Sequence, residues 1–139
     1  MFNNPERRNA MSIDMWQALP AALEDFEKDS SVRVVVLAGA GDKAFISGAD
    51  ISQFESQRST AEAVRRYEEI GDAAQSRLQN FDKPTIAMIR GYCIGGGLGI
   101  AGACDLRVAA DDARFSIPAA KLGLGYRASS MKKLVDIVG

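Results

Sequence analysis

The spacing of hydrophobic and polar residues along the chain predicts two long amphipathic helices. Apolar residues recur every three or four positions over residues 13–28 and 60–81, the period of a helix with one buried face. Ser12 is a suitable N-cap for the first helix, and residues 59–62 (Ser-Thr-Ala-Glu) form a capping box for the second. Pro20 lies inside the first pattern and should kink that helix or divide it in two.

Shorter apolar segments predict strands at residues 32–38, 85–90, 106–110 and 115–117. The first of these is rich in valine and almost continuously apolar, which is typical of a strand covered on both faces. Shorter helices are expected over residues 96–104 and 129–138. Strands that alternate with helices, without repeats or low-complexity segments, indicate an α/β fold with parallel strand pairing.

Length and composition fit one globular domain over residues 1–139, large enough to bury a core. The formal net charge of −1 provides no electrostatic basis for binding nucleic acid or an anionic membrane, and no apolar run approaches the length of a membrane span. Two cysteines without a paired motif favour a reducing, cytoplasmic location. The chain has no histidine, so it lacks the commonest general base and metal ligand, and no metal is expected.

Two glycine-containing junctions carry the clearest chemical signal. The strand at 85–90 leads into Gly95-Gly96-Gly97, which opens a helix, and such a junction offers backbone N–H groups and the helix dipole to a polarised oxygen. Residues 47–51 (Ser-Gly-Ala-Asp-Ile) form a second junction of the same type. Two N–H groups from separate loops that converge on one oxygen form an oxyanion hole.

Residues 97–102 also match the dinucleotide-binding pattern G-x-G-x-x-G. That interpretation requires an acidic residue about twenty positions later, at the end of the next strand. The corresponding residues here are Ala119, Ala120 and Lys121, so a dinucleotide site is not favoured.

Taken together, these segments resemble the enoyl-CoA hydratase/isomerase (crotonase) family. The shared motifs run along nearly the whole chain: Asn-Ala-Met-Ser (9–12), Val-Val-Val-Leu (34–37), Lys-Ala-Phe (43–45), Gly-Ala-Asp-Ile (48–51), Lys-Pro-Thr-Ile-Ala (83–87), Gly-Gly-Gly (95–97), Ala-Cys-Asp-Leu-Arg (103–107), Ala-Arg-Phe (113–115) and Leu-Gly-Leu (122–124). The resemblance implies a crotonase-like spiral of ββα units that binds an acyl-CoA thioester, with coenzyme A as part of the substrate and no separate cofactor. It further implies a cytoplasmic homo-oligomer, a trimer or hexamer, acting in fatty acid metabolism.

By the same resemblance, the backbone N–H groups of Ala49 and Gly96 would hold the thioester carbonyl while enolate charge develops. The coenzyme A moiety would contact Lys43, Ala49, Asp50, Ile51, Gly95 and Gly96, and Arg8 and Ala10 would line the same groove. The family usually has a strand before the segment that matches residues 3–12 and helices beyond the match to Gly139. The chain is therefore expected to be the N-terminal core, without the C-terminal helical region.

The positions that move protons in this family differ here. Hydratases of the family use two glutamates, and Gly99 and Ala119 stand at those positions, so neither side chain exchanges a proton. Dienoyl-CoA isomerases have an aspartate at the position of Gly99 and another near Lys121, so their activity is not supported either. Tyr126 resembles a tyrosine of the methylmalonyl-CoA decarboxylase branch, although that branch has histidine in place of Ala49.

Three functions stay open from the sequence. The first is an acyl-CoA enzyme, a lyase or isomerase of the enoyl-CoA hydratase/isomerase family, with a malonyl-type decarboxylase that uses Tyr126 as a variant. The second is a non-catalytic acyl-CoA-binding homologue that has lost its glutamates. The third is a dinucleotide-binding domain.

Overall fold

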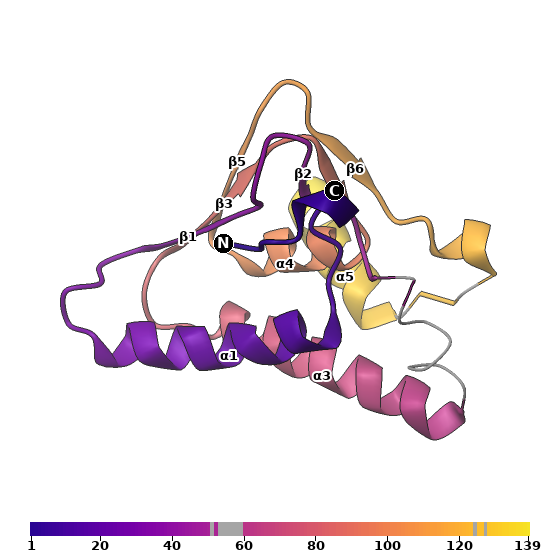
Figure 1. Cartoon of the computed structure of the whole chain (residues 1–139), viewed down its shortest axis with the longest axis horizontal. Coiled ribbons are helices and arrows are strands. Elements are labelled where there is room, and N and C mark those ends of the chain that lie inside the picture. The colour runs from indigo at the N-terminus through magenta and orange to yellow at the C-terminus, as the bar shows by residue number, and fades with distance from the viewer. Residues whose placement is uncertain (51, 53–59, 124, 127) are drawn as a thin grey trace.

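Three successive strand–strand–helix turns make up most of the chain (Figure 1). The computed structural model describes every residue except 51, 53–59, 124 and 127, so Ile51, Ser59 and Leu124 of the sequence motifs lie outside the described residues. The turns are β1 (Val35–Ala38), β2 (Ala44–Ile46) and α3 (Ala61–Gln79), then β3 (Thr85–Ile89), β4 (Tyr92–Ile94) and α4 (Gly96–Ala103), then β5 (Leu106–Ala109), β6 (Arg114–Ser116) and α5 (Ala128–Val138). Two elements precede them, η1 (Pro5–Arg7) and α1 (Ile13–Lys28), and η3 (Ala119–Leu122) lies between β6 and α5.

The two strands of each turn belong to different sheets. The first strands form a sheet in the order β1-β3-β5, and the second strands form a sheet in the order β2-β4-β6. All neighbouring strands are parallel, and in the first sheet Val36, Ile86 and Leu106 lie in register across the three strands. The expected α/β class with parallel pairing is confirmed, and the chain advances from turn to turn as a spiral.

The core lies between the strands and the helices α1, α3 and α4. Figure 1 shows α1 and α3 side by side below the strands, with α4 between them and the sheets. Trp16 of α1 is 4% exposed, and its indole N–H donates to the Tyr67 hydroxyl of α3 at 3.2 Å. The largest fully buried side chains include Phe45 of β2 and Ile100 of α4, so one face of α4 is part of this core. This central position holds the N-terminus of α4 against the ends of the strands.

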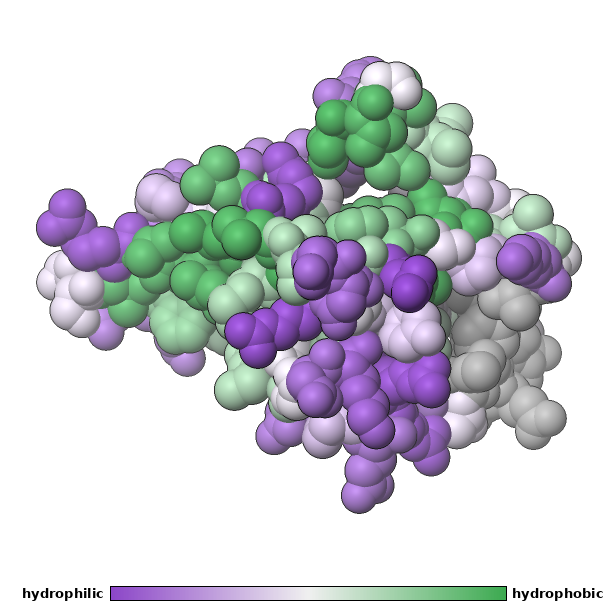
Figure 2. Space-filling view, turned by 90° about the horizontal axis from the view of Figure 1, so that it is seen from above, coloured by the Kyte–Doolittle hydropathy of each residue, from purple (hydrophilic) through white to green (hydrophobic). Residues whose placement is uncertain are grey.

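The expectation that the first strand is covered on both faces is wrong for the described residues. Val35 and Leu37 face the core, whereas Val36 is 49% exposed. Met88 of β3 and Val108 of β5 are exposed on the same face as Val36, because parallel strands in register present alternate residues to each side. Figure 2, seen from above, shows hydrophobic side chains spread over one face of the molecule.

The two long helices form as predicted, with differences at the caps and at proline. Ser12 accepts a hydrogen bond from the Met15 amide at 3.2 Å and begins α1. Of the two effects expected of Pro20, a kink or a division of the helix, division is wrong, because α1 runs without a break from Ile13 to Lys28. The N-cap of α3 is Thr60, whose hydroxyl accepts from the Ala63 amide at 3.1 Å. The expected capping box is therefore one residue out of register.

Asn9 fixes the segment that precedes α1. It has a left-handed backbone (φ 56°) and is completely buried. Its side-chain amide donates to the carbonyls of Ala40 and Ala44 at 2.9 and 2.8 Å, and its side-chain oxygen accepts from the Asn4 amide at 3.0 Å. These bonds anchor the segment leading to Met11 on the loop before β2.

Candidate active site

The carboxyl ends of β2 and β4 bring the two glycine junctions together. Ile46 of β2 pairs with Cys93 of β4, and Ala49 and Gly96 each follow three residues later in the chain, beyond the strand ends. The loops stay close beyond the strands, since a Cβ placed on Gly95 would lie 3.9 Å from the Cα of Gly48. The carboxyl ends of parallel strands are where α/β proteins place ligands. Both junctions found in the sequence therefore meet at one edge of this sheet.

The amide of Ala49 points away from its neighbouring segment. Met11 and Ala49 form a parallel bridge, in which the Met11 amide donates to the Gly48 carbonyl at 2.8 Å and the Asp50 amide donates to the Met11 carbonyl at 3.0 Å. These two bonds flank Ala49, so its own N–H lies on the opposite side of the extended backbone. In the part of the chain that the structure describes, this N–H has no hydrogen-bond acceptor.

The amide of Gly96 lies at the N-terminus of α4, where the helix itself offers it no acceptor. Gly95 is the N-cap of α4 with φ 53° and ψ −113°, a conformation open to glycine, and its amide donates to the Ser116 carbonyl at 2.9 Å. Gly96 is the first helical residue, so no carbonyl within the helix accepts from its N–H. Among the described residues it has no acceptor elsewhere. The positive end of the α4 dipole lies at this N–H.

Close packing fixes the position of this helix end. A Cβ on Gly97 would lie 2.5 Å from the Ile46 carbonyl oxygen, and a Cβ on Gly96 would lie 2.9 Å from Cζ2 of Trp16. Both distances are too short for a side chain, so glycine lets α4 approach β2 on one side and the Trp16 ring on the other. Gly96 and Gly97 are thus explained by the close packing of α4 against Trp16 and β2, as well as by the amide of Gly96, unpaired within the described residues.

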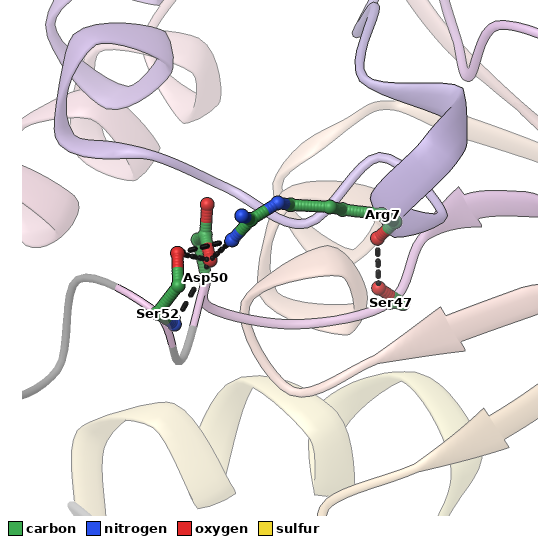
Figure 3. A network of polar contacts seen from close by, with 4 residues as sticks. All are labelled: Arg7, Ser47, Asp50 and Ser52. Carbon is green, nitrogen blue, oxygen red and sulfur yellow. Dashed lines mark hydrogen bonds and ion pairs between the residues drawn. The ribbon is translucent and has the colours of Figure 1, made fainter.

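A polar network holds the loop that carries Ala49 (Figure 3). The Arg7 guanidinium pairs with Asp50 Oδ1 at 2.9 Å and also hydrogen-bonds the Ser52 hydroxyl. The same Asp50 oxygen accepts from the Ser52 hydroxyl at 2.7 Å and from its amide at 3.0 Å, and the Ser47 hydroxyl donates to the Arg7 carbonyl at 3.2 Å. Hydrogen bonds from the Ser52 hydroxyl and then from the Ser52 amide, followed by the Arg7 guanidinium, hold the pKa of Asp50 below its ordinary value. Asp50 is therefore an ionised residue that fixes the loop beside Ala49.

The other residues expected to contact coenzyme A are dispersed. Lys43 is exposed and immediately precedes β2, whereas Ala49 follows the carboxyl end of that strand. The Arg8 guanidinium stacks on the Tyr92 ring at 5.1 Å, and the Ala10 side chain is buried in the core. Ile51 lies outside the described residues.

A cavity of about 720 Å³ lies between α4 and the third ββα turn, which contributes β5, β6 and α5 to its wall. Gly99, Ala119 and Tyr126, which the sequence singled out separately, all line it, together with Gln75 of α3. Tyr126 is 38% exposed, and burial raises the pKa of its phenol above the ordinary value. The remaining lining is largely aliphatic, so the cavity suits an apolar chain that carries few polar groups.

Neither cysteine is poised for chemistry. Cys93 and Cys104 are buried, and burial raises the pKa of each thiol to about 12. Within the described residues, no cluster of three or more Cys, Asp or Glu side chains could hold a metal ion. No helix in the same part of the chain is long and apolar enough to cross a membrane.

The G-x-G-x-x-G pattern at 97–102 lies inside α4. A dinucleotide fingerprint places its glycines in the turn between a strand and a helix, where the backbone approaches the pyrophosphate. Here the glycines are helical, and Gly97 and Gly99 instead approach Ile46 and Gln75. The pattern therefore serves helix packing, as its missing acidic partner indicated.

Residues 1–139 match the protein-family model of the enoyl-CoA hydratase/isomerase family over their whole length. The chain belongs to this family. It is 36% identical to the short-chain-enoyl-CoA hydratase of Clostridium acetobutylicum over 138 residues, 99% of this chain and 52% of that protein. It is 34% identical to the peroxisomal Delta(3,5)-Delta(2,4)-dienoyl-CoA isomerase of Arabidopsis thaliana over 149 residues, 100% of this chain and 53% of that protein.

A solved structure supports the same assignment. An enoyl-CoA hydratase/isomerase family protein from Hyphomonas neptunium superposes with a TM-score of 0.94 and 40% identity, over 98% of this chain and 52% of that one. The crotonase-like spiral expected from the sequence is confirmed. The chain spans about half the length of the curated relatives it matches.

Two residues of the candidate site were not predicted from the sequence. Trp16 packs against Gly96, and the sequence carries no signal for that contact. Gln75 lines the cavity next to Gly99, and here a signal existed. It lies four residues after Gly71 and three before Leu78, both buried, so a polar residue interrupts the buried face of α3.

Proposed function

We propose that this chain forms the thioester-binding core of an acyl-CoA enzyme, with the amides of Ala49 and Gly96 as its oxyanion hole. The observation that carries the proposal is that the two loops lie close together beyond the carboxyl ends of β2 and β4, where a Cβ on Gly95 would lie 3.9 Å from the Cα of Gly48. Neither amide has an acceptor among the described residues. Two fixed donors with no internal partner are available to an oxygen of a ligand.

The chemistry follows from those donors. When a base removes a proton next to a thioester, or a carboxylate leaves from that carbon, negative charge moves onto the thioester oxygen. Two N–H groups held at hydrogen-bond distance, one of them at a helix N-terminus, stabilise this charge without reorganisation. Loss of one such donor typically costs about 10²–10³ in rate. The proposal needs no cofactor beyond the coenzyme A of the substrate.

The residues that line the cavity limit the range of reactions that the proposal includes. Gly99 and Ala119 both line it, and neither carries a carboxylate that splits or orients water. Classical hydration by paired glutamates is therefore not part of the proposal. A reaction whose main requirement is a stabilised enolate fits these residues better.

Decarboxylation of a malonyl-type thioester is the second candidate, and Tyr126 favours it. Its raised pKa keeps the phenol protonated at neutral pH, on the wall of the same cavity. The bond to the carboxylate breaks, carbon dioxide leaves, and the electron pair forms the thioester enolate. The Tyr126 hydroxyl then gives its proton to the α-carbon and is reprotonated by water. Tyr126→Phe should slow carbon dioxide release from malonyl-CoA while leaving its affinity unchanged; an unchanged rate would remove Tyr126 from the reaction.

A matched pair of ligands tests the oxyanion hole itself. Butyryl-CoA carries the thioester carbonyl, whereas the thioether S-butyl-CoA has the same length without it. Two neutral hydrogen bonds should make the thioester bind roughly 5- to 100-fold more tightly. Fluorescence of Trp16, the single tryptophan, reports binding because its ring lies against Gly96. Equal affinities for the two ligands would contradict the proposal.

Turnover separates an enzyme from a non-catalytic binding homologue. An enzyme should convert at least one member of a panel of enoyl- and malonyl-type thioesters, whereas a binding homologue binds them without change. For a binding homologue, Gly99→Glu with Ala119→Glu should restore hydration. Because the Gln75 amide lies against Gly99, this variant also needs Gln75→Ala to make room.

A further inference from the structure

Gln75 is the polar residue on the buried face of α3. Ala74, beside it, is completely buried, and Leu78, one turn later, is 1% exposed. Gln75 itself is half-buried and lines the cavity together with Gly99 and Leu98 of α4. Its carboxamide is thus directed from one helix onto the next, at the wall of the cavity.

The absence of a side chain at Gly99 makes room for this carboxamide. A Cβ at position 99 would lie 2.6 Å from Gln75 Oε1, 3.1 Å from Cδ and 3.3 Å from Nε2. All three atoms of the amide group therefore lie where a side chain of residue 99 would begin. Gln75 and Gly99 are complementary, and the polar group at this point of the cavity comes from α3 instead of α4.

The carboxamide has hydrogen-bonding capacity that the fold does not use. It has two N–H donors and an oxygen acceptor, it has no hydrogen-bond partner among the described residues, and its polar atoms are therefore accessible from the cavity. The cavity wall is mainly apolar, with Ile89, Phe115 and Leu134 among its residues, and besides Gln75 its polar side chains are those of Arg107, Ser116, Tyr126, Ser130 and Lys133. In an apolar pocket, a few placed polar groups determine which ligand is preferred.

We propose that Gln75 is a specificity-determining residue whose carboxamide hydrogen-bonds a hydroxyl group on the acyl chain of the thioester. A hydroxyl both donates and accepts, as the carboxamide does, whereas a hydrocarbon chain does neither. A carboxamide does not exchange protons at neutral pH, so Gln75 orients the acyl group and takes no part in proton transfer. This inference rests on the proposed function.

The test compares butyryl-CoA with 3-hydroxybutyryl-CoA, two thioesters of equal chain length. The wild-type chain should bind the hydroxylated thioester roughly two- to tenfold more tightly, the contribution of one neutral hydrogen bond. Gln75→Leu should abolish this preference while retaining affinity for butyryl-CoA. Gln79→Leu is the matched control, because Gln79 is exposed at the end of the same helix and should keep the preference.

Gly99→Ala provides an independent variant. Its Cβ would displace the carboxamide without removing it, and alanine favours the helix. It should lose the same preference. A wild-type chain that binds both thioesters equally, or variants that keep the wild-type ratio of affinities, would overturn the role of Gln75 but not the proposed function. A wild-type chain that binds neither thioester would refute the proposed function, and the inference with it.

Discussion

Replacing Gly97 by alanine should destabilise the fold and disturb the candidate oxyanion hole, whereas the same change at Gly102 should do neither. Both glycines lie in α4, so the gain in helix propensity, at most about 1 kcal/mol, has the same sign in both variants. They differ in what the added Cβ meets. At Gly102 the nearest atom is Ile137 Cδ1 at 3.5 Å, an ordinary contact with the end of a side chain.

At Gly97 the added Cβ meets the backbone. It would lie 2.5 Å from the Ile46 carbonyl oxygen and 2.7 Å from the Ile46 Cβ, so no change of side-chain rotamer relieves the clash. The N-terminus of α4 has to move away from β2. Overpacking of this kind typically costs about 1–3 kcal/mol, which equals or exceeds the propensity gain. The same movement displaces the Gly96 amide, and a shift of about 1 Å can cost roughly 10²-fold in rate.

Urea denaturation and thioester titration of both variants measure these effects. Because the propensity gain is common to both variants, Gly97→Ala should have a free energy of unfolding about 1–3 kcal/mol lower than Gly102→Ala. It should also lose most of the preference for butyryl-CoA over S-butyl-CoA, which Gly102→Ala keeps. If the two variants were equally stable and kept the same preference, the close approach of α4 to β2 would not be what positions the amide.

Three further predictions concern stability and reactivity. Asn9→Ala should lower the free energy of unfolding by roughly 2–4 kcal/mol in urea denaturation, because it removes the hydrogen bonds of a completely buried amide. Asp105→Asn should make the free energy of unfolding fall less steeply in acid. The hydroxyl and the amide of Thr85 each donate to Asp105 Oδ2 at 2.8 Å, and these hydrogen bonds lower the pKa of the Asp105 carboxyl in the folded protein. The stabilisation by this carboxylate is therefore present above the unfolded pKa of about 3.9 and is lost as the pH falls through the lower folded pKa. Cys93 and Cys104 should resist a thiol reagent at neutral pH in the native protein and react once it is unfolded, because burial raises both pKa values to about 12.

Each of these predictions has a clear contrary result. A loss well below 1 kcal/mol on Asn9→Ala would mean that water replaces its bonds. An acid transition that Asp105→Asn leaves unchanged would mean that other carboxylates determine it. Rapid labelling of either thiol in the native protein would show that the core around α4 opens readily.

The sequence predicts the two long helices and the strands β1, β3, β5 and β6, but it misses the strands β2 and β4. A helix of 16 residues, such as α1, repeats its apolar period several times, whereas β2 and β4 have three residues each. Three residues contain little more than one period of a strand, so no pattern separates them from a loop. The open face at Val36 was also missed, since a continuous apolar run does not tell which face is covered.

For the candidate site too, the sequence predicts some features and misses others. The sequence identifies both glycine junctions, because closely spaced glycines after a strand are costly unless the backbone requires them. It does not reveal that Ile46 and Trp16 are the reason for Gly97 and Gly96, since both contacts bring together residues distant in the chain. The Gly99–Gln75 contact likewise joins two helices that only the fold brings into contact.

The central claim is that the amides of Ala49 and Gly96 hold one thioester oxygen. The most direct measurement is a titration of the ¹⁵N-labelled chain with butyryl-CoA, in which the amide proton shifts of both residues are followed by NMR. Both protons should move downfield together and saturate at the same thioester concentration. If binding saturated while either proton kept its shift, the two amides would not share the carbonyl and the account would be wrong.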